Sequence, residues 1–280
     1  MKNILIFFFL WNVMISNAQN TKPEIYGHRG FRGKYPENSI LGFQKAIELG
    51  ISGIELDVVV NKDSQLVISH EPFFQKEYCL DSTGHNIETE NDFNIYHLTQ
   101  KEIELFDCGT KPYSKFSGQL KTKTIKPLFQ TFVEQVDLKH AIVLFEIKSD
   151  PKEIGVSQPN IDEYVKIILD ELSHFQYKSK IRIMSFDAEI LEQIHQKDPS
   201  YQIIYLTYLP KSPNSFLKKL SFRPFALGMY YPTINGKTAK ILHQKNIKLF
   251  SWTVNEIKQK EKMMKLGVDG IITDFPDILK

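Results

Sequence analysis

The chain carries its most reactive side chains in short groups near its beginning: His28-Arg29, Pro36-Glu37-Asn38, Glu55-Leu56-Asp57 and His70-Glu71. All of these groups except Pro36-Glu37-Asn38 stand at the downstream end of a short apolar run that predicts a β-strand. Two histidines, an arginine and two carboxylates separated by one residue suit metal-assisted attack on a phosphodiester. Such groups collect at strand ends on the catalytic face of a (β/α) barrel.

The strands that would position these groups run over 24–27, 53–60 and 66–69, and a helix over 39–49 lies between the first two. Asn38 or Ser39 can cap this helix, and Gly50 can end it. The link between the second and third strands is too short for a crossover helix, so it is either a hairpin or an extended return.

From residue 128 onward, helices and strands alternate regularly. The pattern predicts helices over 128–136, 161–172, 188–195, 236–245 and 256–266, and strands over 141–147, 181–186, 201–206, 225–231, 248–254 and 270–273. Such alternation indicates a parallel sheet with helical crossovers, and the number of strands suits an α/β fold of the (β/α)₈ TIM-barrel type. Glu146 lies within an apolar strand, where a carboxylate is costly to bury unless it is paired, for example with Lys148, or bound to a cation.

The stretch over about 71–126 breaks this alternation, and we expect it to be a small insertion over the mouth of the barrel. One short helix is predicted within it, over 99–106, and its basic run over 121–126 is expected to be a solvated loop. Cys79 and Cys108 lie in the insertion, where they could form a disulfide or remain separate buried thiols.

The N-terminus has the pattern of a cleavable signal peptide over 1–18. Lys2 is followed by an apolar segment over 4–15 that is too short to span a membrane, and Ser16-Asn17-Ala18 places small residues before the expected cut after Ala18. No cysteine follows that could carry a lipid anchor. We therefore expect a periplasmic or secreted protein without stable membrane insertion, in which residues 19–280 form one domain.

The overall charge does not favour nucleic-acid binding. The formal net charge is only +2 and the pI is about 8.3, and no concentrated basic face with interleaved aromatic residues is visible. A hydrophobic content of 42% over 280 residues is sufficient for a full barrel core.

The sequence resembles the glycerophosphodiester phosphodiesterase family. The resemblance rests on blocks that follow in family order from about residue 24 to the C-terminus: Gly27-His28-Arg29-Gly30, Pro36-Glu37-Asn38-Ser39, Gly53-Ile54-Glu55-Leu56-Asp57-Val58, Lys62-Asp63, Val67-Ile68-Ser69-His70, Phe145-Glu146-Ile147-Lys148, Trp252-Thr253-Val254-Asn255 and Gly270-Ile271-Ile272-Thr273-Asp274. The chain departs from the family pattern at Ser39, Ser64 and Glu71, where the family usually has Thr, Gly and Asp.

The resemblance implies a (β/α)₈ barrel with a small insertion after the third strand, and a role for each of several residues. His28 and His70 would act as acid and base, and Glu55, Asp57 and Glu146 would bind a divalent cation, Ca²⁺ or Mg²⁺. Arg29 and Lys148 would bind the phosphate, and Trp252 would pack on the glycerol. The implied reaction releases glycerol 3-phosphate and an alcohol, through a cyclic phosphate, and for an exported enzyme it suggests phosphate or glycerol scavenging.

Two other functions fit the same fold. One is a lysophospholipase D-like or sphingomyelinase-like lipid phosphodiesterase, for which Phe73, Phe74 and Tyr78 could form an apolar mouth. The other is a non-catalytic binder of phosphorylated ligands. At single residues, Glu37 could start the first helix or orient Arg29, Asp274 could cap a loop, and Tyr230-Tyr231 is expected in the barrel wall. The sequence leaves open the head-group preference, the metal, which histidine is the base, and the oligomeric state.

Overall fold

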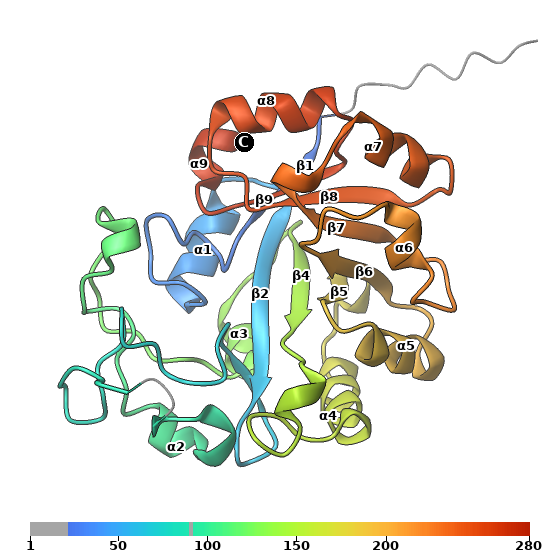
Figure 1. Cartoon of the computed structure of the whole chain (residues 1–280). Coiled ribbons are helices and arrows are strands. Elements are labelled where there is room, and N and C mark those ends of the chain that lie inside the picture. The colour runs from blue at the N-terminus through green and yellow to red at the C-terminus, as the bar shows by residue number, and fades with distance from the viewer. Residues whose placement is uncertain (1–21, 90–91) are drawn as a thin grey trace, which may run out of the picture.

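The computed structural model describes residues 22–89 and 92–280, so the expected signal peptide over 1–18 lies outside the described residues. Eight parallel strands form a closed barrel, which confirms the predicted TIM-barrel fold (Figure 1). They are β1 (Glu24–Gly27), β2 (Gly53–Val60), β4 (Ile142–Ile147), β5 (Ile181–Ser185), β6 (Gln202–Thr207), β7 (Ala226–Tyr230), β8 (Lys248–Trp252) and β9 (Gly270–Thr273). Pairing of β1 with both β9 and β2 closes the barrel.

The interior of the barrel is filled by apolar side chains that alternate along the strands. Tyr26, Leu144, Met184, Ile204 and Phe250 are all buried in this inner cluster, as in other packed barrels of this type. The pairing of β2 with β4 places Glu55 beside Leu144 and Asp57 beside Glu146. This register therefore brings carboxylates from two strands to the same end of the barrel.

Helices cover the outside of the barrel, and most lie close to their predicted bounds. They are α1 (Ile40–Glu48), α3 (Phe129–Gln135), α4 (Ile161–Ser173), α5 (Ala188–Lys197), α6 (Pro213–Leu217), α7 (Gly236–His243), α8 (Ile257–Lys265) and α9 (Pro276–Leu279). Ser39 caps α1 by accepting a hydrogen bond from the Gly42 backbone N–H at 3.0 Å. The sequence pattern missed α6 and α9, because helices this short show no apolar periodicity.

The link between β2 and β3 (Leu66–Ile68) is a hairpin, which settles the alternative left open above. β3 pairs antiparallel with β2 and is the ninth strand of the sheet, outside the barrel proper. Asn61 holds the turn, because its side-chain oxygen accepts hydrogen bonds from the Asp63 and Gln65 backbone N–H groups. The hairpin fixes the direction in which the chain reaches His70.

Between β3 and α3 the chain forms a separate lobe beside the barrel, seen on the left of Figure 1. The lobe has its own apolar cluster, which includes Phe74, Tyr78, Ile95 and Phe106. A disulfide joins Cys79 to Cys108 inside this cluster.

Two predictions for this lobe were wrong. The helix expected over 99–106 is only α2 (Gln100–Ile103), because the backbone of Asp107 turns away to pair with Leu80. Phe74 and Tyr78 do not form an apolar mouth, since both are buried in the core of the lobe.

Within the described part of the chain, none of the helices has the length and apolar character that a membrane crossing requires.

Candidate active site

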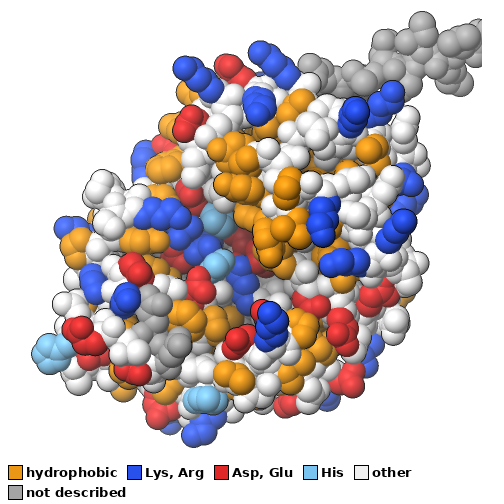
Figure 2. All heavy atoms as spheres, viewed as in Figure 1, with side chains coloured by type: hydrophobic (Ala, Val, Ile, Leu, Met, Phe, Trp, Pro, Cys, Tyr) orange, Lys and Arg blue, Asp and Glu red, His pale blue; other side chains and the backbone are white. Residues whose placement is uncertain are grey.

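A cavity of about 340 Å³ opens at the C-terminal ends of the barrel strands. Figure 2 shows histidine side chains inside this hollow, with basic groups on one side and a patch of apolar side chains on the other. The predicted site residues that line the cavity are His28, Arg29, Glu55, His70, Glu146, Lys148 and Trp252. Asp57 is fully buried next to them, so the fold brings all eight predicted site residues together.

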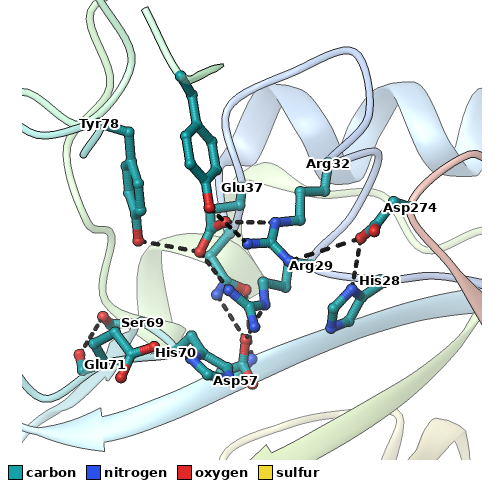
Figure 3. Close-up of polar contacts among 12 residues, drawn as sticks. His28, Arg29, Arg32, Glu37, Asp57, Ser69, His70, Glu71, Tyr78 and Asp274 are labelled. Atoms are coloured by element: carbon teal, nitrogen blue, oxygen red, sulfur yellow. Dashed lines mark hydrogen bonds and ion pairs between the residues drawn. The ribbon is translucent and has the colours of Figure 1, made fainter. Parts of the chain in front are cut away.

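His28 is held by a carboxylate from the other end of the chain. It follows β1, and its Nδ1 lies 2.6 Å from Asp274 Oδ1, directly after β9 (Figure 3). Asn255 donates a hydrogen bond to Asp274 Oδ2 at 2.8 Å. Burial raises the pKa of Asp274, but His28, Arg32 and Asn255 outweigh this effect and lower it to about 2. An ionised Asp274 accepts the Nδ1 proton of His28, which leaves Nε2 as the nitrogen free for chemistry.

His70 follows β3 and is paired with its neighbour in sequence. Its Nδ1 lies 2.5 Å from Glu71 Oε1. Burial, followed by the charges of Arg29 and Lys148, lowers the pKa of His70 to about 4. The ring is therefore neutral near pH 7 and can accept a proton.

A buried lysine supports the turn that carries His70. Lys126 donates a hydrogen bond to Ser69 Oγ at 2.7 Å, and Ser69 Oγ donates to the Glu71 carbonyl at 2.6 Å. Burial lowers the pKa of Lys126 to about 8. The expectation that the run over 121–126 is entirely solvated was therefore wrong at Lys126, because this side chain points inward beneath the turn.

Arg29 is fixed by a network of buried ion pairs. Its Nη1 lies 2.7 Å from Glu37 Oε1 and its Nε lies 3.3 Å from Asp57 Oδ2. Glu37 also pairs with Arg32 Nε at 2.6 Å and accepts a hydrogen bond from Tyr78 at 3.1 Å (Figure 3). Of the two alternatives for Glu37, the structure shows the one in which it orients Arg29.

Three buried carboxylates lie beside Arg29. One oxygen from each of Glu55, Asp57 and Glu146 lies within 4.8 Å of the others. Lys148 pairs with Asp57 Oδ1 at 2.8 Å and with Glu146, while Asn38 donates to Asp57 Oδ2 at 2.8 Å.

The charge state of the three carboxylates depends on their partners. Burial, then the negative charges of Asp57 and Glu146, raise the pKa of Glu55 well above its usual value. Burial acts in the same direction on Asp57, but the adjacent Lys148 holds its pKa well below the usual range. Glu55 Oε1 is buried and has no hydrogen-bond partner among the residues that the structure describes. An unpartnered carboxylate oxygen in a set of hard oxygen donors fits a Ca²⁺ or Mg²⁺ ion.

Aromatic side chains form the opposite wall of the cavity. The centroid of the Trp252 ring lies 5.5 Å from that of Phe186 and 5.4 Å from that of Tyr230. The ring centroids of Phe186 and Tyr208 are 6.0 Å apart. Tyr230, the last residue of β7, is 40% exposed and packs against Trp252, whereas Tyr231 packs against the core. The Trp252 indole N–H is buried, and no residue in the described part of the chain accepts its hydrogen bond, so it can serve as a donor to a bound ligand.

Sequence reasoning missed the roles of Asp274 and Lys126. The sequence places Asp274 in a family block and as a possible loop cap, but not beside His28. The signal for that pairing is its place at the end of the last strand, next to the end of β1 in a closed barrel. Nothing in the sequence around Lys126 distinguishes it from its exposed neighbours Lys121 and Lys123.

Comparisons with known proteins agree with this geometry. Residues 28–278 match the model of the glycerophosphoryl diester phosphodiesterase family. A glycerophosphodiester phosphodiesterase of Bacillus altitudinis is 31% identical over 260 residues, which cover 91% of this chain and 95% of the relative. A glycerophosphoryl diester phosphodiesterase structure from Silicibacter pomeroyi superposes with a TM-score of 0.80 at 24% identity, covering 91% of this chain and 90% of that one. A phosphodiesterase of Oleispira antarctica, solved with the product sn-glycerol-3-phosphate, has a TM-score of 0.74 at 18% identity and covers 92% and 95%.

Proposed function

Because the chain belongs to the glycerophosphoryl diester phosphodiesterase family and is a phosphodiesterase of that class, we propose that it hydrolyses glycerophosphodiesters to glycerol 3-phosphate and an alcohol by histidine acid–base catalysis. The observation that carries this proposal is the pair of histidines, His28 and His70, in one cavity with Arg29 and Lys148. The fixed cations offset the negative charge that develops on the phosphoryl oxygens in the transition state.

The reaction proceeds in two steps that use the same two imidazoles. The glycerol hydroxyl next to the phosphate attacks phosphorus while one histidine takes its proton, and the other histidine protonates the departing alcohol oxygen as its P–O bond breaks. Water then opens the cyclic phosphate with the proton transfers reversed. The ionised Asp274 stabilises the imidazolium form of His28, and Glu71 does the same for His70.

Glu55, Asp57 and Glu146 would hold a divalent cation, Ca²⁺ or Mg²⁺, which when bound supplies Lewis-acid stabilisation of phosphoryl charge. Arg29 and Lys148 contribute positive charge from the protein itself, and their carboxylate partners fix both side chains. Trp252 packs against the glycerol carbons, and its indole N–H is available to a glycerol hydroxyl.

The direct test is release of glycerol 3-phosphate from glycerophosphocholine, with and without Ca²⁺ or Mg²⁺. We expect metal-dependent release that disappears in His28→Ala, while His195→Ala, on the outer helix α5, keeps the wild-type rate. A diester that lacks the glycerol hydroxyl next to the phosphate should remain uncleaved, because the first attack needs that oxygen. Metal-independent release, or full activity of His28→Ala, would contradict the mechanism.

A lysophospholipase D-like activity is the second candidate, and the aromatic wall favours it. Phe186, Tyr208 and Tyr230 are 36%, 60% and 40% exposed next to Trp252, so an acyl chain on the glycerol could lie across them. The same protein should then release choline from lysophosphatidylcholine as efficiently as from glycerophosphocholine. Much slower turnover of the lysolipid would remove this candidate.

We also propose that the protein is exported through the signal peptide over 1–18, on the basis of its sequence pattern. The test is N-terminal sequencing of the protein from the periplasm or the medium. An N-terminus at Gln19 is expected, whereas an intact Met1 in the cytoplasm would contradict export.

A further inference from the structure

A second cavity of about 320 Å³ adjoins the catalytic cavity. The two cavities share His70, Glu146, Lys148 and Phe186 as a common wall. His28, Arg29 and Trp252 line only the first cavity. A phosphodiester carries two alcohols, so a phosphate bound at the common wall with its glycerol on Trp252 directs the other alcohol into the second cavity.

The second cavity combines apolar surface with carboxylates. Val59, Pro72, Ile147 and the ring of Phe186 form its apolar surface. The carboxylates are Glu71, Asp150 and Glu153. Among the residues that the structure describes, neither Asp150 nor Glu153 forms an ion pair with a lysine or arginine. Among the described residues that line this cavity, Lys148 is the only lysine or arginine. Its ion pairs are with Asp57 and Glu146 at the common wall, and not with Asp150 or Glu153.

Hydrogen bonds within the β4–α4 loop hold the two unpaired carboxylates in place. Asp150 caps the 3₁₀ helix η4 (Pro151–Glu153) by accepting from the Lys152 backbone N–H at 3.0 Å. Glu153 Oε2 accepts from Ser157 Oγ at 2.8 Å. Each carboxylate therefore has a second oxygen that accepts no hydrogen bond from any of the described residues.

We propose that the second cavity binds the leaving alcohol and selects one that carries a quaternary ammonium group, as choline does. Such a group has a positive charge spread over methyl groups, so it is attracted by carboxylates and by an aromatic face while its methyl groups contact apolar walls. A neutral polyol gains neither the charge attraction nor the contact with the Phe186 ring. This inference rests on the proposed function, because it names the substrate class of the same site.

The test compares kcat/KM for glycerophosphocholine and glycerophosphoglycerol, which differ only in the leaving alcohol. The variant is Asp150→Asn with Glu153→Gln, since both amides keep an oxygen for the hydrogen bonds from Lys152 and Ser157. Asp162→Asn with Glu163→Gln is the matched control, because it removes two exposed carboxylates from the first turn of α4, outside the cavity lining. Glu71 is left unchanged, because it pairs with His70.

We expect the wild type to prefer glycerophosphocholine about fivefold or more, the ratio that about 1 kcal/mol of cation–π and charge attraction provides. The double amide variant should lose most of this preference, because kcat/KM for glycerophosphocholine falls much further than kcat/KM for glycerophosphoglycerol, and the control should retain it. Equal wild-type rates on the two diesters, or a preference that survives in the amide variant, would overturn the inference and leave the proposed function intact. Absence of turnover with both diesters would overturn the proposed function and, with it, the inference.

Discussion

At the scale of single residues, Asp274 determines how His28 presents its ring. The carboxylate accepts the Nδ1 proton at 2.6 Å and is itself held by Asn255, so the ring has one tautomer and one orientation. The pair joins the beginning and the end of the chain, since His28 follows β1 and Asp274 follows β9. Burial lowers the pKa of His28, while the charge of Asp274 opposes that effect.

Asp274→Asn should lower kcat by about 10² or more, because an amide of similar size does not stabilise an imidazolium. Without the carboxylate the pKa of His28 falls further, so the limb of the pH–rate profile that reports His28 should move to lower pH. The measurement is kcat across the pH range for this variant and for Asp277→Asn, which removes a carboxylate that pairs with the surface residue Lys34. A pH profile that does not move would show that Asp274 has no influence on the titration of His28.

The residues of the site differ in how far the sequence could predict them. His28, Glu55 and Asp57 belong to or directly follow recognisable strands of the barrel, so their meeting followed from the barrel fold. His70 follows the hairpin strand β3, whose direction the sequence left open. Arg32 lies in the irregular loop between β1 and α1, where it pairs with Glu37, and Lys126 lies in the irregular segment before α3, where it reaches Ser69. Strand periodicity carries no information about such segments, which is why these contacts needed the structure.

At the scale of elements, the inserted lobe differs from the rest of the fold in what holds it together. The barrel has continuous strand pairing, whereas the lobe has short helical turns, a small apolar cluster and the Cys79–Cys108 disulfide. Tyr78, next to Cys79, donates to Glu37, which in turn orients Arg29. The lobe therefore contacts the catalytic site through a chain of buried polar groups. Sequence analysis could not predict this contact, because it left undecided whether Cys79 and Cys108 form a disulfide.

Replacing both cysteines by alanine should destabilise the lobe by about 3.6 kcal/mol, the loop-entropy value for a crosslink of this span. We expect a lower thermal midpoint and a raised KM, because a loosened Tyr78 no longer supports Glu37. Calorimetry and kinetics of the double variant, beside wild type with and without reductant, measure both effects. Unchanged stability after verified reduction would show that the apolar cluster alone holds the lobe.

At the scale of the whole molecule, a bound cation should stabilise the complete barrel, because its three proposed ligands come from the neighbouring strands β2 and β4, which pair from Gly53 with Ile142 to Val58 with Ile147. A ligand that binds only the folded state adds about 2.7 kcal/mol at a hundredfold excess over Kd. We expect Ca²⁺ or Mg²⁺ to raise the thermal midpoint of wild type and to have little effect on Glu55→Gln. An equal rise in both proteins would show that the ion binds elsewhere.

The response of the whole fold to acid depends on carboxylates whose pKa values are shifted in opposite directions. Burial raises the pKa of Glu37, but Arg29 and Arg32 outweigh this and hold it well below its ordinary value of 4.5. A carboxylate with a lowered folded-state pKa contributes stability above its unfolded pKa and loses it as the pH falls toward the folded value. Glu55 acts in the opposite sense, because burial and neighbouring carboxylates raise its pKa and it takes up a proton more readily in the folded state.

Glu37→Gln separates the contribution of Glu37 to acid sensitivity from that of Glu55. Near pH 7 the variant should be less stable than wild type by about 3 kcal/mol, since two buried guanidinium groups lose their shared partner. Below about pH 4.5 the difference should shrink with a slope of up to about 1.4 kcal/mol per pH unit, because Glu37 then becomes protonated in the unfolded wild type but not in the folded protein. Urea unfolding of both proteins from pH 7 to pH 3 measures this slope, and Glu48→Gln on the surface of α1 should show no pH-dependent difference from wild type. A difference between wild type and Glu37→Gln that stays constant down to pH 3 would mean that packing, and not the charge of Glu37, stabilises the network.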